Sequence, residues 1–169
     1  MNKRWLLRHY RGYPPTVRRV LVNEHLSQNL KVLESLRKQY PNIYAIPSKM
    51  ANLLVKGGRL KEAIRVWSKT LKQFPGKPNP YFERAHWALR RRDFEEVQKY
   101  MRLCLMRDRG YFRETAHFWR AEALFQLGRR NEALAELRDV RDDYEEHWFL
   151  DYRSRSKSDM LKDIQAGGG

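Results

Sequence analysis

The chain has one cysteine among its 169 residues and no long apolar run. A single thiol, Cys104, excludes an intramolecular disulfide and favours a reducing compartment. The apolar run near the N-terminus, Trp5-Leu6-Leu7, is too short for a secretion signal, and no stretch reaches the roughly 18 apolar residues of a membrane-spanning helix. These absences predict a soluble, cytoplasmic protein without a membrane span.

Negative charge is scarce as well. The chain holds 35 Lys and Arg against 20 Asp and Glu, which gives a net charge of +15 and a sequence pI of about 10.2. The excess lies in residues 1–100, with 22 basic and 7 acidic residues, whereas residues 101–169 hold 13 of each. Solvated helix faces explain high charge but not this asymmetry. The N-terminal part is therefore expected to meet an acidic partner.

A motif of glycine, then Glu-Ala, then a large apolar residue and a proline recurs along the chain. Its clearest copy is Gly58–Trp67, which is followed by Phe74-Pro75, and a second good copy is Leu127–Leu137. A degenerate copy spans Arg92–Val97, and a faint one spans Asn29–Pro41. The small or medium residue near the start of the second helix falls at intervals of 34, 34 and 36 residues, at Asn29, Ala63, Val97 and Ala133. This period is typical of paired-helix repeats.

These copies resemble the tetratricopeptide repeat family over about residues 10–146. The first helices carry Ala51, Ala85 and Ala121 where a small side chain lets two helices approach closely. The family's usual Trp and Leu-Gly are mostly missing, and Arg92 replaces the turn glycine of the third hairpin. The resemblance implies an all-α fold, a right-handed superhelix of about four helix hairpins with a short C-terminal capping segment at Trp148–Leu150.

Three regions are expected along the chain. Residues 1–13 form a basic, aromatic arm, residues 14–152 form the repeat domain, and residues 153–169 form a polar, mobile tail whose final glycines are set aside as an artificial end. No strands are expected. Ala63 and Ala133 should be buried where paired helices meet. The predicted helix pairs are 15–23 with 26–39, 44–57 with 60–74, 79–91 with 94–107, and 113–127 with 130–143.

In this family the first helices of successive pairs line a concave groove. Matching each repeat to that pattern implies a protein-binding groove that is basic at one end and aromatic at the other, where cations meet acidic groups and rings accept apolar side chains. The family's carboxylate clamp for chaperone tails is matched only at Asn52, which argues against a co-chaperone. The expected groove residues are Arg18, Lys49, Asn52, Lys56, Asn79, Phe82, His86, Arg90, Phe118 and Phe125.

Catalytic signatures are absent from the sequence. It has no glycine-rich phosphate loop, no His-Glu-x-x-His zinc motif and no Cys/His cluster, and no base lies near Cys104 in sequence. We therefore expect no enzyme activity, no catalytic residues, no metal or other cofactor, and no small-molecule substrate.

Three functions fit these features. The first is a non-catalytic adaptor or scaffold whose basic groove binds an acidic protein or peptide. The second is a dedicated inhibitor, such as a toxin-neutralising immunity protein, which suits the small size and the uneven charge. The third is an RNA- or DNA-associated helical repeat, which suits the high pI and the mixture of Arg, Trp and Tyr in the arm.

Overall fold

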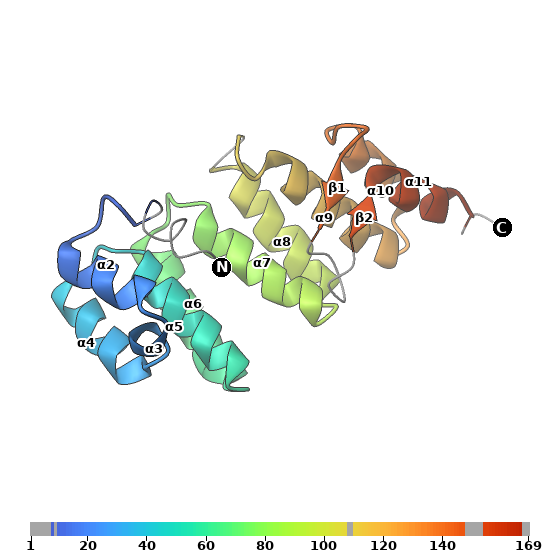
Figure 1. Cartoon of the computed structure of the whole chain (residues 1–169). Coiled ribbons are helices and arrows are strands. Elements are labelled where there is room, and N and C mark those ends of the chain that lie inside the picture. Colours follow the sequence, from blue (N-terminus) through green and yellow to red (C-terminus); the bar gives the residue numbers. More distant parts are fainter. Residues whose placement is uncertain (1–7, 9, 108–109, 148–153, 167–169) are drawn as a thin grey trace. The chain divides into compact units, whose positions relative to one another are not determined.

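The computed structural model describes residues 8, 10–107, 110–147 and 154–166. Most of the expected arm, the capping segment Trp148–Leu150 and the final glycines lie outside the described residues. The chain divides into two compact units, residues 1–75 (unit 1) and residues 76–169 (unit 2) (Figure 1). A single repeat domain over residues 14–152 stays a prediction.

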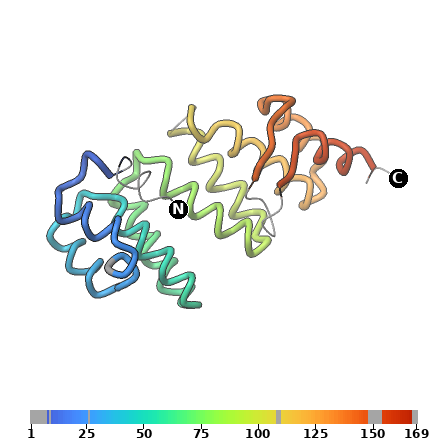
Figure 2. Tube along the Cα trace, in the orientation of Figure 1, coloured from blue at the N-terminus to red at the C-terminus, as the bar shows by residue number. Residues whose placement is uncertain are grey.

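Unit 1 is a run of antiparallel helices around one apolar core (Figure 2). Its helices are α2 (Pro15–Val22), α3 (Glu24–Ser27), α4 (Leu30–Gln39), α5 (Ala45–Lys56) and α6 (Leu60–Gln73). Helix α4 packs against α5, and α5 packs against α6. The core residues recur at intervals of three and four within each helix, as an amphipathic helix requires; they are Val17, Val20, Leu21, Leu33, Leu36, Ile46 and Met50.

Unit 2 continues the pattern of sequential pairs. Its helices are α7 (Asn79–Arg90), α8 (Phe94–Leu105), α9 (Arg113–Gln126), α10 (Arg130–Leu137) and α11 (Lys157–Ala166). Each of the first four packs against its neighbour in sequence, which confirms the predicted all-α helical repeat. One difference is a pair of two-residue antiparallel strands, β1 (Glu145–Glu146) and β2 (Arg155–Ser156), where no strands were expected.

Small side chains are fully buried where the paired helices meet. Ala63 and Ala133, as predicted, are 0% exposed, and Val97 has the same burial. Each is the fourth residue of its helix, in α6, α10 and α8 respectively. The small residues of the first helices, Ala51, Ala85 and Ala121, are also completely buried. These positions leave no room for a larger side chain, because folded interiors are close-packed.

The first repeat departs from the predicted alignment. Asn29 is not a buried packing residue but the N-cap of α4, and its side-chain oxygen accepts bonds from the backbone N–H of Lys31 (3.0 Å) and Val32 (3.3 Å). The fourth residue of α4 is Leu33, which is fully buried. The alignment was therefore wrong by four residues. The helix expected over 26–39 is also interrupted, because an asparagine amide favours starting a helix over continuing one.

The turns between paired helices share a left-handed residue. Gly58 and Gly128 have φ values of +72° and +76°, which glycine adopts without a Cβ clash. In the third hairpin Arg92 adopts the same conformation, with φ of +58°, and the next backbone N–H, that of Asp93, donates to the carbonyl of Ala88 at 2.9 Å. The turn is thus kept without glycine, at a cost of about 1–2 kcal/mol.

The C-terminal part folds where a mobile tail was expected. Residues 157–166 form α11, which packs against α10 and buries Met160 and Ile164. Ser156 caps this helix, since its Oγ accepts from the backbone N–H of Asp159 (3.1 Å) and its own backbone N–H donates to the Asp159 carboxylate (3.3 Å). This reciprocal capping box starts a helix despite the polar composition around it.

The burial of Ala133 generates a test with a matched control in the same helix. Ala133→Phe should lower the free energy of unfolding by about 1–3 kcal/mol, because the added ring overpacks a site without free volume. Ala135→Phe, at an exposed position of α10, should change it by less than about 0.5 kcal/mol. Urea unfolding followed by circular dichroism measures both; equal effects would contradict the repeat packing.

Candidate functional site

The two units differ in the proportion of basic side chains that form ion pairs with carboxylates. Unit 1 holds 16 basic and 3 acidic residues, whereas unit 2 holds 19 and 17. Basic side chains of unit 2 pair widely with carboxylates, as in Arg84–Glu96 (2.6 Å) and Arg120–Glu136 (2.8 Å). Within the described residues of unit 1, the one ion pair is Arg59–Glu62, at 2.6 Å. Most cations of unit 1 are therefore left for solvent or for a partner.

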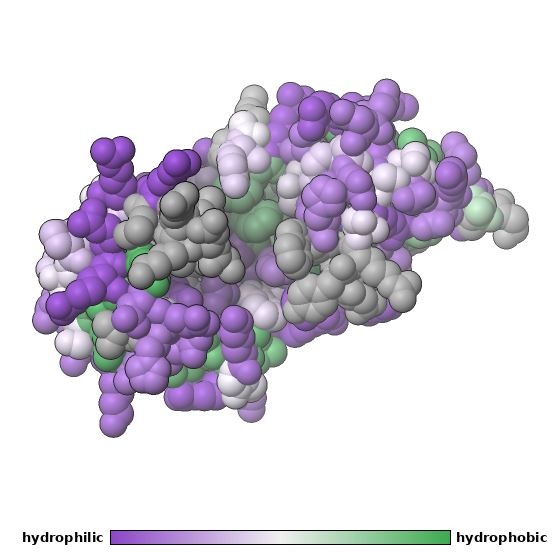
Figure 3. Space-filling view, in the orientation of Figure 1, coloured by the Kyte–Doolittle hydropathy of each residue, from purple (hydrophilic) through white to green (hydrophobic). Residues whose placement is uncertain are grey.

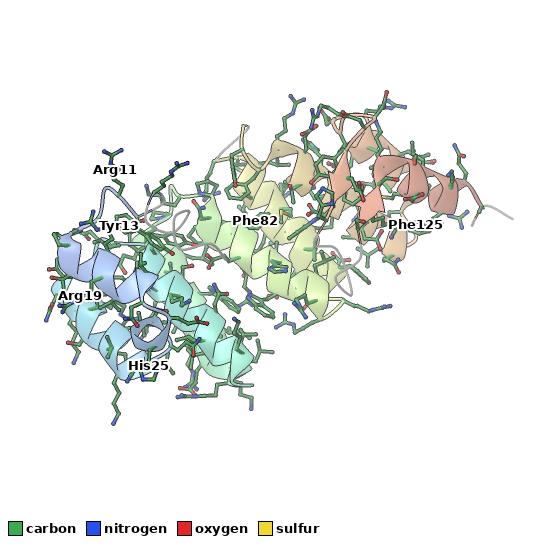
Figure 4. The ribbon with its side chains drawn as sticks, viewed as in Figure 1. Arg11, Tyr13, Arg19, His25, Phe82 and Phe125 are labelled. Atoms are coloured by element: carbon green, nitrogen blue, oxygen red, sulfur yellow. The ribbon has the colours of Figure 1, made fainter. Side chains whose placement is uncertain are left out.

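A cleft of about 820 Å³ opens in unit 1 beside α2, α3 and α5. Helix α5 contributes Lys49 and Lys56, which lie seven residues apart and therefore on one helix face. Figure 4 labels two further lining residues, Arg19 on α2 and His25 on α3. The full lining combines cations with apolar and amide side chains: Tyr10, Pro15, Arg18, Arg19, Leu21, Val22, Asn23, Glu24, His25, Ser27, Gln28, Lys49 and Lys56.

The cleft carries unbalanced positive charge. Its four permanent cations are Arg18, Arg19, Lys49 and Lys56, none of which forms an ion pair with a carboxylate of the described chain. Glu24 is the acidic residue of the lining. Burial lowers the pKa of Lys49, the charge of Lys56 lowers it further, and Glu24 acts in the opposite direction. An anion entering the cleft would offset this repulsion and stabilise the charged form of Lys49.

Three of the four groove residues expected in unit 1 come together. Arg18, Lys49 and Lys56 all line the cleft, whereas Asn52 is half-buried on α5 and does not line it. The sequence interpretation missed Arg19 and His25 as lining residues. It assigned residues 26–39 to a single helix, while the observed break before α4 leaves the short helix α3 to complete the cleft wall.

In unit 2 an aromatic stack joins the inner faces of α7 and α9. The ring of Phe82 lies 4.6 Å from that of Phe112 and 5.0 Å from that of Trp119, and His86 lies 5.6 Å from Trp119. Burial, and then the nearby charge of Arg90, lower the pKa of His86 to about 4. His86 is therefore a neutral packing residue at physiological pH. Phe82 and His86 form a half-buried surface rather than an open pocket.

The predicted groove face of α9 is covered by the chain itself. Phe118 is 0% exposed and lies 5.3 Å from the ring of Tyr144. Thr115 and Tyr144 share a hydrogen bond of 2.9 Å, and the fully buried Glu122 accepts from Arg155 at 2.8 Å. Phe118 is thus a core residue rather than an open groove residue, because residues preceding β1 and within β2 lie over this face.

The remaining expected residues of unit 2 stay near the surface. Asn79 and Arg90 are exposed at the two ends of α7, and Phe125 is half-buried near the end of α9 (Figure 4). The ten predicted residues divide between the two units, four in unit 1 and six in unit 2. A single continuous groove stays a prediction. The candidate binding site is the cleft of unit 1, whose lining residues all belong to that unit.

The described residues offer little to metal or thiol chemistry. Among them, no group of three His, Cys, Asp or Glu residues is placed to hold a metal ion. Cys104 is buried. No helix of the described chain has the length and apolar character needed to cross a membrane. The surface of unit 1 is instead largely hydrophilic in the view of Figure 3.

The lowered pKa of His86 predicts a pH dependence of stability. Below pH 6.5 the unfolded chain takes up a proton at this residue, and the folded chain does so only near pH 4. The free energy of unfolding should therefore fall by up to about 3 kcal/mol as pH drops through that window. His86→Phe keeps a ring in the stack but cannot titrate, so the difference in unfolding free energy between wild type and variant should change with pH across this window. Parallel stability curves for the two proteins would contradict the assignment.

Comparison with known families agrees with the helix pattern. Residues 115–147, which cover most of α9, all of α10 and β1, match the tetratricopeptide repeat model. A search of curated proteins found no match to this chain. The matched segment lies at one end of a series of sequentially packed helix pairs with buried small residues and left-handed turns. Residues 115–147 thus resemble a tetratricopeptide repeat, within a chain whose described helices form an all-α helical repeat.

Proposed function

We propose that this chain is a non-catalytic adaptor or scaffold whose basic cleft in unit 1 binds an acidic protein segment. Tetratricopeptide-type repeats generally serve as protein-interaction surfaces. The observation that carries the acidic specificity is the set of unpaired cations, Arg18, Arg19, Lys49 and Lys56, around one cleft. The single buried cysteine supports a reducing, cytoplasmic location.

The chemistry of the lining favours a peptide with both acidic and apolar side chains. Leu21, Val22 and Pro15 supply an apolar wall beside the cations. A carboxylate that pairs with Lys49 meets a half-buried ammonium, where an ion pair is stronger than at a fully exposed position. An apolar neighbour in the ligand would cover Val22 and Pro15, which adds a non-ionic contribution to affinity.

The same cleft suits the inhibitor alternative, in which the acidic segment belongs to an enzyme or toxin. The adaptor and inhibitor functions differ in what binding does to the partner, because only an inhibitor would abolish the partner's activity. The nucleic-acid alternative is supported by the 16 basic residues against 3 acidic ones in unit 1. It predicts binding spread over many phosphate contacts and a steep salt dependence.

Two double variants on neighbouring helices test the cleft. Lys49→Gln/Lys56→Gln should weaken binding of a fluorescent Glu-Glu-Leu repeat peptide at least tenfold, or about 1–2 kcal/mol, because both lost charges line the cleft. Lys61→Gln/Lys72→Gln removes the same charge from exposed positions of α6 outside the cleft and should change affinity less than about twofold. Fluorescence anisotropy at low and moderate salt measures both.

Three outcomes separate the alternatives. Equal losses in the two double variants would show that only net charge matters and would remove the cleft as the site. Tight binding of a single-stranded RNA, with no peptide binding, would replace the protein-binding function by the nucleic-acid one. Peptide binding that weakens with salt and depends on Lys49 and Lys56 supports the proposed function.

A further inference from the structure

The C-terminal segment of unit 2 is held by two cations that meet two carboxylates. In β2, Arg155 Nη1 donates to Glu122 Oε2 of α9 at 2.8 Å. Two residues later, Lys157 Nζ donates to Asp142 Oδ1 at 2.8 Å and to the carbonyl oxygen of Val140 at 2.7 Å. The segment thus presents an Arg-X-Lys pattern to an acidic surface.

The receiving surface is unusual in having a buried carboxylate at its centre. Glu122 is 0% exposed, and burial raises its pKa, which the charge of Arg155 and a hydrogen bond from Gln126 oppose. Burying an ion pair contributes little net stability, and well-packed apolar residues often replace such a pair without loss. A structural cap therefore has no need of this pair. A surface that must recognise one kind of segment does need such a pair, because a segment without a matching cation leaves the buried carboxylate without a partner.

The attachment of the segment is limited in extent. Strand β2 pairs with β1 over two residues on each side. Helix α11 then buries Lys157, Met160 and Ile164, while Asp163, the second partner of Arg155 (2.6 Å), is exposed. Elements with few buried contacts open locally far more often than the whole domain unfolds. Segment Arg155–Ala166 can therefore leave its surface while α7 to α10 stay folded.

We propose that this surface is a binding site for basic segments of another protein and that residues 155–166 occupy it in cis. The site consists of Glu122, Asp142, the edge of β1 and the adjoining face of α10. Its ligand carries an Arg-X-Lys segment, whose first two residues extend the sheet at β1 and whose lysine begins an amphipathic helix. A tethered occupant has an effective concentration near the millimolar range, so a partner must bind tightly to displace it. This site is separate from the cleft of unit 1 and prefers the opposite charge.

The probe is a fluorescent, end-capped peptide of residues 154–166, added to the full-length protein. Arg155→Ala/Lys157→Ala weakens the cis segment but keeps both carboxylates of the site. This variant should bind the peptide at least tenfold more tightly than the wild type, whose site is filled. Adding Glu122→Gln should abolish that gain. The matched control, Arg102→Ala/Arg138→Ala, removes two exposed arginines of unit 2 and should behave as the wild type.

The proposal fails if the folded Arg155/Lys157 variant binds the peptide no better than the wild type. If circular dichroism shows that this variant does not fold, Lys157→Ala alone gives the same comparison, because its partner Asp142 is solvent-exposed. Hydrogen exchange of the wild type is an independent readout. Amides of α11 should exchange well before those of α9, and exchange of both only at the rate of global unfolding would overturn the proposal. Neither result depends on ligand binding in unit 1.

Discussion

Close approach of paired helices at small, fully buried side chains is the constraint on which the rest of the structure depends. Ala51 and Ala63 satisfy it in α5 and α6, and Ala121 and Ala133 satisfy it in α9 and α10. Once these positions face inward, the 3.6-residue period decides which side chains of the first helix face away from its partner. Lys49 and Lys56 reach one cleft for this reason, as residues on a single face of a helix whose rotation is fixed by packing.

Electrostatics then distinguishes two units of similar helical design. In unit 2 the carboxylates neutralise most cations nearby, including those of the C-terminal segment. In unit 1 the cations around the cleft remain unpaired, and like charges close together oppose the folded state. A fold that keeps such repulsion is stabilised by any anion that binds there. Relief of this repulsion is therefore one contribution to the affinity for an acidic ligand.

The sequence allowed much of the fold to be predicted and less of the site. The Glu-Ala motif after a turn glycine predicted α6 and α10 correctly. A small packing residue and a left-handed turn are both local requirements, and each selects residue types that can be recognised in the sequence. Asn29 was misplaced because an asparagine near a helix start fits either a packing position or a cap, and only the backbone bonds decide. Helix α11 was missed although Ser156 and Asp159 form a capping box ahead of Met160 and Ile164, since the surrounding serines and basic residues indicated a loop.

Phe118 and Glu122 show why a repeat register predicts faces better than it predicts accessibility. Glu122 stands at the register position of Asn52 and His86, and it does lie on the inner face of α9. The repeat register does not predict that a later segment of the chain folds over that face, because the contact between Arg155 and Glu122 joins residues 33 positions apart. The charge on the face nevertheless indicates what covers it. Glu122 of α9 pairs with the chain's own Arg155, and Asp142 pairs with Lys157. By the same physical rule we propose that the basic cleft of unit 1 binds an acidic segment of another molecule.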